Sequence, residues 1–62
     1  MWTTVYMTQN IDVAKAMRKK IEEKKIIAML KTNKVEDNLG GDYFEILVPS
    51  AEIKEALDII IE

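Results

Sequence analysis

Few side chains in this 62-residue chain have the chemistry that catalysis requires. The chain has no cysteine and no histidine, which excludes a thiolate nucleophile, an imidazole base and a zinc site built from these residues. Ser50 is the only serine, and it follows Pro49 where a helix is expected to begin, so its hydroxyl is expected to cap that helix. A serine without a histidine to activate it is a poor nucleophile. The sequence therefore predicts a protein that is not an enzyme.

The polar segment from Asn33 to Asp42 contains the other candidate groups. Its acidic side chains do not follow the spacing of a calcium-binding loop, and Gly40-Gly41 belongs to no phosphate-binding glycine motif. We therefore expect neither a metal site nor a cofactor. The segment is long, polar and glycine-tipped, so it is expected to be the most mobile part of the chain. The residues included in this expectation are Asn33, Lys34, Glu36, Asp37, Asn38, Gly40 and Gly41.

Three segments have the residue types and the alternation of β-strands. They are Trp2 to Thr8, Ile26 to Thr32, and Tyr43 to Val48. Pro49 is expected to end the third strand, because proline has no N–H group for the ladder of hydrogen bonds.

Two further segments have apolar residues at the spacing of an amphipathic helix. The first extends from Ile11 to about Lys24 after an Asn10 cap, and the second follows Ser50. The expected apolar stripes are Val13, Ala14, Met17 and Ile21 on the first helix, and Ile53, Ala56, Leu57 and Ile60 on the second. Ile59 lies off the second stripe, so either it faces a partner or residues 59–61 form a short final strand.

The element order β-α-β-β-α predicts one α+β domain over residues 1–62, a two-layer ferredoxin-like split β-α-β sandwich. The expected strand order in the sheet is first, third, second. Both helices are expected on one face, and the fourth strand of this fold is missing or vestigial. The predicted core is Val5, Met7, Ala14, Met17, Ile21, Ile26, Ala28, Leu30, Phe44, Ile46, Val48, Ile53, Leu57 and Ile60.

The other face of the sheet is expected to have no helix over it. Its predicted residues are Trp2, Thr4, Tyr6, Ile27, Met29, Lys31, Tyr43, Glu45 and Leu47. An uncovered antiparallel sheet usually alternates to polar residues on its solvent side. Most of these side chains are instead apolar or aromatic, which is typical of an interface.

Several short strings carry a resemblance to a known family. They are Val5-Tyr6, Ala14 with Met17 and Ile21, Ile26-Ile27-Ala28, and Ile46-Leu47-Val48-Pro49 before an acidic helix. This pattern resembles the prokaryotic signal-transducing proteins, which are small ferredoxin-like domains reminiscent of the PII nitrogen regulators. The resemblance implies a regulatory role and no catalytic residues. Members of that family tend to have a glycine between the first helix and the second strand, where this chain has Lys24-Lys25.

The charge and the length of the chain indicate what kind of partner it binds. The net charge is −2, with basic residues concentrated in residues 15–34 and acidic residues in residues 35–62. A chain this short has a marginal core and no disulfide, which favours a homodimer through the uncovered face, the edge of the first strand, or both. A different protein partner is the alternative. Single-stranded RNA is a further alternative, since aromatic side chains on an open sheet stack bases, but the acidic balance disfavours it.

No run of apolar residues approaches the length of a membrane span, and the start of the chain does not read as a signal peptide. We therefore expect a cytoplasmic protein without membrane association.

Overall fold

The computed structural model describes residues 1–34 and 41–62. Its elements, in chain order, are β1 (Trp2–Thr8), α1 (Ile11–Glu22), β2 (Met29–Asn33), β3 (Tyr43–Pro49), a 3-10 turn (Ser50–Glu52) and α2 (Ile53–Ile60). Of the residues expected to be most mobile, Glu36, Asp37, Asn38 and Gly40 lie outside the described residues. Asn33 is the last residue of β2, and Lys34 and Gly41 flank the gap.

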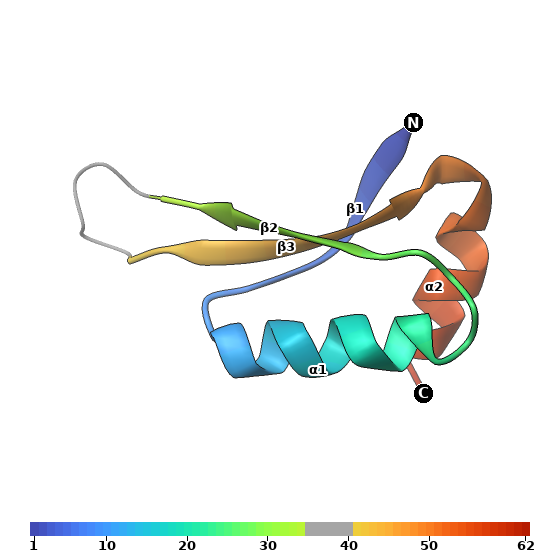
Figure 1. Ribbon diagram of the computed structural model, residues 1–62, viewed down its shortest axis with the longest axis horizontal. Coiled ribbons are helices and arrows are strands. Elements are labelled where there is room, and N and C mark those ends of the chain that lie inside the picture. Colours follow the sequence, from blue (N-terminus) through green and yellow to red (C-terminus); the bar gives the residue numbers. More distant parts are fainter. Residues whose placement is uncertain (35–40) are drawn as a thin grey trace.

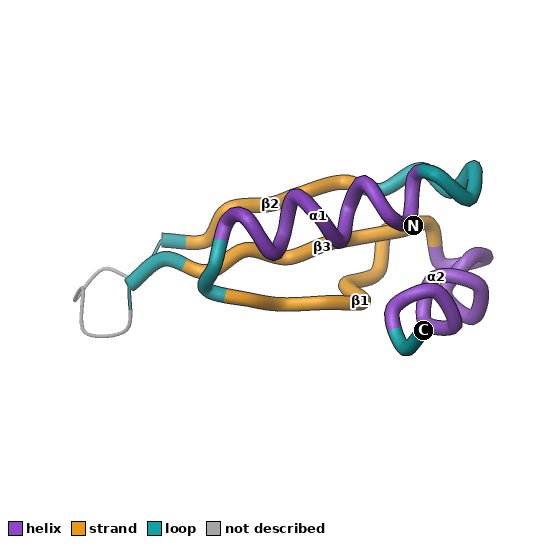
Figure 2. The backbone as a smooth tube through the Cα atoms, turned by 90° about the horizontal axis from the view of Figure 1, so that it is seen from below, coloured by secondary structure: helices purple, strands orange, loops and turns teal. Residues whose placement is uncertain are grey.

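The three strands form one antiparallel sheet in the order β1-β3-β2. Both helices lie on the same side of this sheet (Figure 1), and α1 lies along β2 and β3 while α2 lies near one end of the sheet (Figure 2). The predicted α+β class, the element order and the strand order are confirmed. The two layers bury one face of the sheet and leave the other without a helix.

Helix α1 begins where the sequence predicts. The Asn10 side chain accepts hydrogen bonds from the backbone N–H groups of Asp12 (2.9 Å) and Val13 (3.2 Å), which satisfies two of the donors that a helix start leaves free. Ala14 and Ile21 are fully buried on the face toward the sheet. Val13 belongs to the predicted stripe but is exposed, so the buried stripe of α1 is narrower than expected.

Strand β3 is the centre of the core. Ile46 and Val48 are fully buried, which confirms the predicted face of this strand. Leu30 stands opposite Ile46 in the register and packs on the same side. The buried core comprises Ala14, Ile21, Ile26, Ala28, Ile46, Val48, Ala56 and Ile59, with Val5, Tyr6, Met17, Leu30, Phe44, Ile53 and Ile60 packed partly buried against it.

Strand β1 contains a bulge that the alternation in the sequence does not reveal. Thr4 stands opposite Leu47, but the next partners in the register are Tyr6 and Ile46, so Val5 is the extra residue. A bulge of this kind reverses the alternation of side chains beyond it. Tyr6 therefore packs toward the core, and Met7 is 57% exposed on the other face. The prediction of Tyr6 on the open side and of Met7 in the core is wrong.

Strand β2 begins at Met29, three residues later than predicted. Extending the register would place Ile27 opposite Pro49, which has no N–H group to donate. The segment before β2 still alternates, since Ile26 and Ala28 are buried while Ile27 is 67% exposed. Ile27 is thus not part of the sheet, contrary to the prediction.

The chain enters α2 through the 3-10 turn, so Ser50 does not cap the helix as predicted. The Ser50 hydroxyl donates to the backbone carbonyl of Met1 (3.0 Å) and lies 2.8 Å from the Thr3 hydroxyl. The Ser50 N–H also donates to the Met1 carbonyl, at 2.8 Å. Ser50 therefore connects the end of β3 to the start of β1.

The face of α2 that packs on the sheet also differs from the prediction. Ala56 and Ile59 are buried, whereas Leu57, expected in the core, is 42% exposed. The two candidate stripes differ by a small rotation about the helix axis, and the observed one turns Ala56 and Ile59 toward the core. Ile59 belongs to the core, and the helix continues to Ile60, so residues 59–61 form no strand.

The buried face of α2 can be tested by truncation. We expect Ile59→Ala to lower the free energy of unfolding by about 2–4 kcal/mol, because it removes a buried side chain and leaves a cavity. Leu57→Ala is the matched control and should cost under about 1 kcal/mol at its exposed position. Urea unfolding followed by circular dichroism measures both. A larger loss for Leu57→Ala would contradict the observed rotation of α2.

The turn after α1 places a lysine in an unusual backbone conformation. Lys25 has φ 69°, the left-handed region that favours glycine. The N–H groups of Lys24 and Lys25 donate to the carbonyls of Ile21 and Glu22, both at 3.0 Å, so the turn is held by the end of the helix. Lys25 therefore occupies a position where helices commonly have glycine.

We expect Lys25→Gly to raise the free energy of unfolding by about 0.5–1 kcal/mol. The substitution relieves the left-handed strain, and the greater freedom of glycine in the unfolded chain offsets only part of that gain. Lys24→Gly is the control. Lys24 does not have a positive φ, so this substitution relieves no strain and only increases the conformational entropy of the unfolded chain, which should lower the free energy of unfolding. The urea midpoint should rise for Lys25→Gly and fall for Lys24→Gly. A fall for Lys25→Gly together with a rise for Lys24→Gly would contradict this expectation.

Candidate functional site

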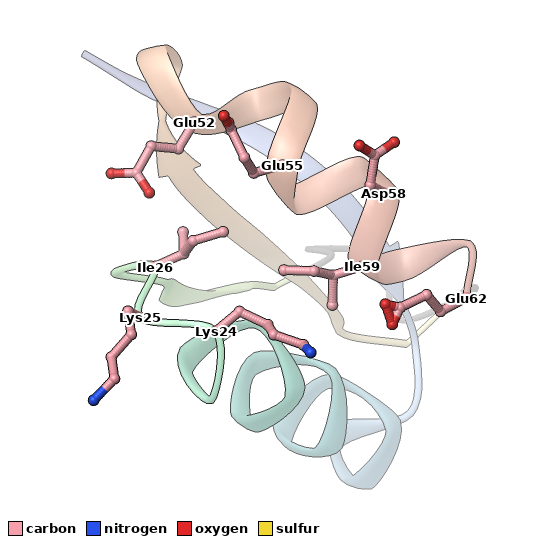
Figure 3. Close-up of a pocket in the computed structure, with 8 residues that line it drawn as sticks. All are labelled: Lys24, Lys25, Ile26, Glu52, Glu55, Asp58, Ile59 and Glu62. Atoms are coloured by element: carbon pink, nitrogen blue, oxygen red, sulfur yellow. The ribbon is translucent and has the colours of Figure 1, made fainter.

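Two surfaces of the described part of the chain are candidates for a functional site. The first is a groove of about 520 Å³ between α2 and the turn that follows α1 (Figure 3). The second is the side of the sheet opposite the helices. The groove is lined by Lys24, Lys25, Ile26, Glu52, Glu55, Asp58, Ile59 and Glu62.

The groove has charged side chains along its sides and two core isoleucines at its base. Ile26 and Ile59 at its base are buried in the core. The Lys24 amine points toward the end of α2, whereas the Lys25 side chain points away from the groove (Figure 3). In residues 1–34 and 41–62, no ion pair crosses the groove. The groove therefore offers a ligand charged side chains of both signs above an apolar base.

The hydroxyl of Ser50, the one serine, is engaged within the fold. It donates to the Met1 carbonyl at 3.0 Å and lies 2.8 Å from the Thr3 hydroxyl. Within the described residues, no three acidic side chains come close enough together to hold a metal ion. Among the same residues, no helix has the length and apolar character to cross a membrane.

The register of the sheet defines the second surface, because residues directly opposite in an antiparallel pair lie on the same face. We call this surface the open face. It consists of Trp2, Thr4, Met7, Met29, Lys31, Asn33, Tyr43, Glu45, Leu47 and Pro49. Seven of these ten residues were predicted from the sequence, and Pro49 was expected to end the strand. Met7 and Asn33 take the places predicted for Tyr6 and Ile27, and no feature of the sequence marks the bulge that brings Met7 there.

Glu45 lies at the centre of the open face and joins all three strands. Its carboxylate accepts hydrogen bonds from the Thr4 hydroxyl on β1 (2.9 Å) and from the Asn33 amide on β2 (2.5 Å). Lys31 stands directly opposite Glu45 in the register, but no ion pair between them is formed in the described structure. The Glu45 carboxylate thus has a structural function, and the Lys31 amine is free to meet another charge.

Apolar side chains surround this polar centre. Trp2, Met7 and Met29 are exposed, while Tyr43 and Leu47 on the central strand are partly buried. Methionine side chains are flexible and polarizable, so they adapt to different partner surfaces. The open face thus combines a polar centre with exposed apolar side chains around it.

Comparison of the chain with models of known protein families, with curated proteins and with solved structures gives no match.

The structural function of Glu45 can be measured with a double-mutant cycle. We expect Glu45→Ala and Asn33→Ala each to lower the free energy of unfolding, and the two to couple by about 0.5–1.5 kcal/mol, because each removes one partner of the same hydrogen bond. Lys31→Ala paired with Glu45→Ala is the control, and its coupling should be close to zero. Urea unfolding of all single and double variants gives the coupling energies. Strong coupling to Lys31 and none to Asn33 would contradict the observed contacts.

Proposed function

We propose that this chain is a non-enzymatic protein-interaction domain that binds through its open face. The observation that carries the proposal is the position of both helices on the other side of the sheet, which leaves exposed apolar side chains on the open face. Exposed apolar patches on small domains usually mark interaction sites. The lining of the groove, in comparison, offers mainly charged side chains to a ligand.

A regulatory role is the second part of the proposal. It is supported by the resemblance to the prokaryotic signal-transducing proteins, a class whose members are expected to act by binding rather than by chemistry. The cytoplasmic location expected from the sequence belongs to the same proposal.

Single-stranded RNA is a less suitable ligand for the open face. Base stacking needs aromatic side chains, and Tyr6 packs toward the core, which leaves Trp2 and Tyr43. The central Glu45 would repel phosphate groups, and Lys31 is the one basic residue of the face. The remaining lysines and the arginine of the described chain lie outside this face.

Photo-crosslinking in the native cell tests whether the open face binds protein. A photoreactive phenylalanine analogue replaces Met7 on the open face in one variant and Ile61, which is 79% exposed after α2, in the control. We expect the Met7 variant to form a discrete crosslinked protein species. Adding Met29→Glu to the same chain should remove that species, because a buried, unpaired carboxylate opposes binding.

Two results would contradict the proposal. One is equal labelling at both positions, and the other is labelling at Met7 that Met29→Glu does not change. Circular dichroism of each variant shows whether the fold is kept. Retention of single-stranded RNA in a gel-shift assay at low salt, lost in Met29→Glu, would favour the nucleic-acid alternative instead.

A further inference from the structure

The open face has features that match it to a copy of itself. We propose that its partner is the open face of a second copy of this chain, in a two-fold symmetric dimer. This inference rests on the proposed function, since it identifies the protein that the open face binds.

The charged side chains of the open face suit a second copy of the same face. The open face carries one basic and one acidic side chain, Lys31 and Glu45, adjacent across β2 and β3. Because its charges balance, neither a strongly acidic nor a strongly basic partner is favoured. In a two-fold pair each face meets the same set of residues, so Lys31 of each copy meets a surface whose acidic group is Glu45. The Lys31 amine, unpaired within the described chain, gains a partner in this arrangement.

The two edge strands of the sheet are poorly suited to pairing with a strand of another copy. Edge-to-edge pairing would need a straight run of unpaired backbone groups, but the bulge at Val5 interrupts β1 in its middle. Strand β2, the other edge, has Lys31 and only five residues. Both edges are therefore poor templates for a further strand. Two copies are therefore expected to associate through the open face and not through a strand edge.

The area of the open face sets the expected affinity. Strands β1 and β3 have seven residues each and β2 has five; at about 3.3 Å per residue and about 4.8 Å between strands, they cover roughly 300 Å² in projection. Stable complexes bury about 800 Å² of accessible surface per partner. Protruding side chains such as Trp2 and Met7 add to the projected area, but the interface is still smaller than this. We therefore expect a reversible dimer with a Kd of tens of micromolar, on the order of weak complexes.

The single tryptophan makes the inference directly measurable. Trp2 lies on the open face, so its fluorescence reports whether that face is covered. We expect sedimentation equilibrium between about 1 and 500 µM to show a monomer–dimer equilibrium. Over the same range, the Trp2 emission should shift to shorter wavelength as the dimer forms.

Variants assign the contact to the open face. Met29→Glu should raise the Kd at least about tenfold and abolish the emission shift, while Ile61→Glu, at an exposed isoleucine after α2, should leave the Kd within about twofold. Lys31→Glu alone and Glu45→Lys alone should each be monomeric, since like charges then face each other. An equimolar mixture of the two should recover the dimer.

Three results would overturn the inference. They are a monomer at every concentration, a dimer that Ile61→Glu dissociates while Met29→Glu does not, and dimer formation without a change in Trp2 emission. If the isolated chain is monomeric but crosslinking from Met7 to a different protein depends on Met29, the inference fails and the proposed function stands. If neither self-association nor crosslinking depends on Met29, both fail. Circular dichroism of each variant separates loss of contact from loss of fold.

Discussion

The pairing of β1 with β3 around the bulge at Val5 decides which side chains form the core and which lie on the open face. Before the bulge, Thr4 stands opposite Leu47, and beyond it Met7 stands opposite Glu45. The extra residue lets Val5 and Tyr6 both pack toward the helices. It also exchanges an aromatic ring on the open face for a flexible methionine, which favours contact with an adaptable protein surface over base stacking.

The size of the chain sets the second constraint. Two helices cover one face of a three-stranded sheet, and the described residues contain no further helix for the other (Figure 1). The open face is stabilised from within by Glu45, whose carboxylate joins β1 and β2 to the central strand. Around this polar centre the face presents exposed apolar side chains, which are the feature that supports the proposed binding function. The groove beside α2 is instead lined mainly by charged residues.

Residue patterns predicted the architecture but not its local irregularities. The strand order, the Asn10 cap and the buried face of β3 follow from alternation, helical spacing and capping chemistry. The bulge at Val5 does not, because threonine, valine and tyrosine suit either face of a strand. Leu57 and Ile59 are both large and apolar, so periodicity alone cannot choose between them, and the choice depends on tertiary packing. Most of the open face was predicted, and the part that was missed depends on the bulge.

The central claim is that the open face set by this bulge binds a second copy of the chain. The most direct measurement is a dilution series of amide NMR spectra of the whole chain, from about millimolar to about micromolar concentration. We expect the amide chemical shifts of Trp2, Thr4, Met7 and the strand residues beside Glu45 to change most with concentration. The amide chemical shifts of α1 and α2 should stay constant. Shifts confined to the helices, or spectra that do not change with concentration, would contradict the claim of a self-binding face.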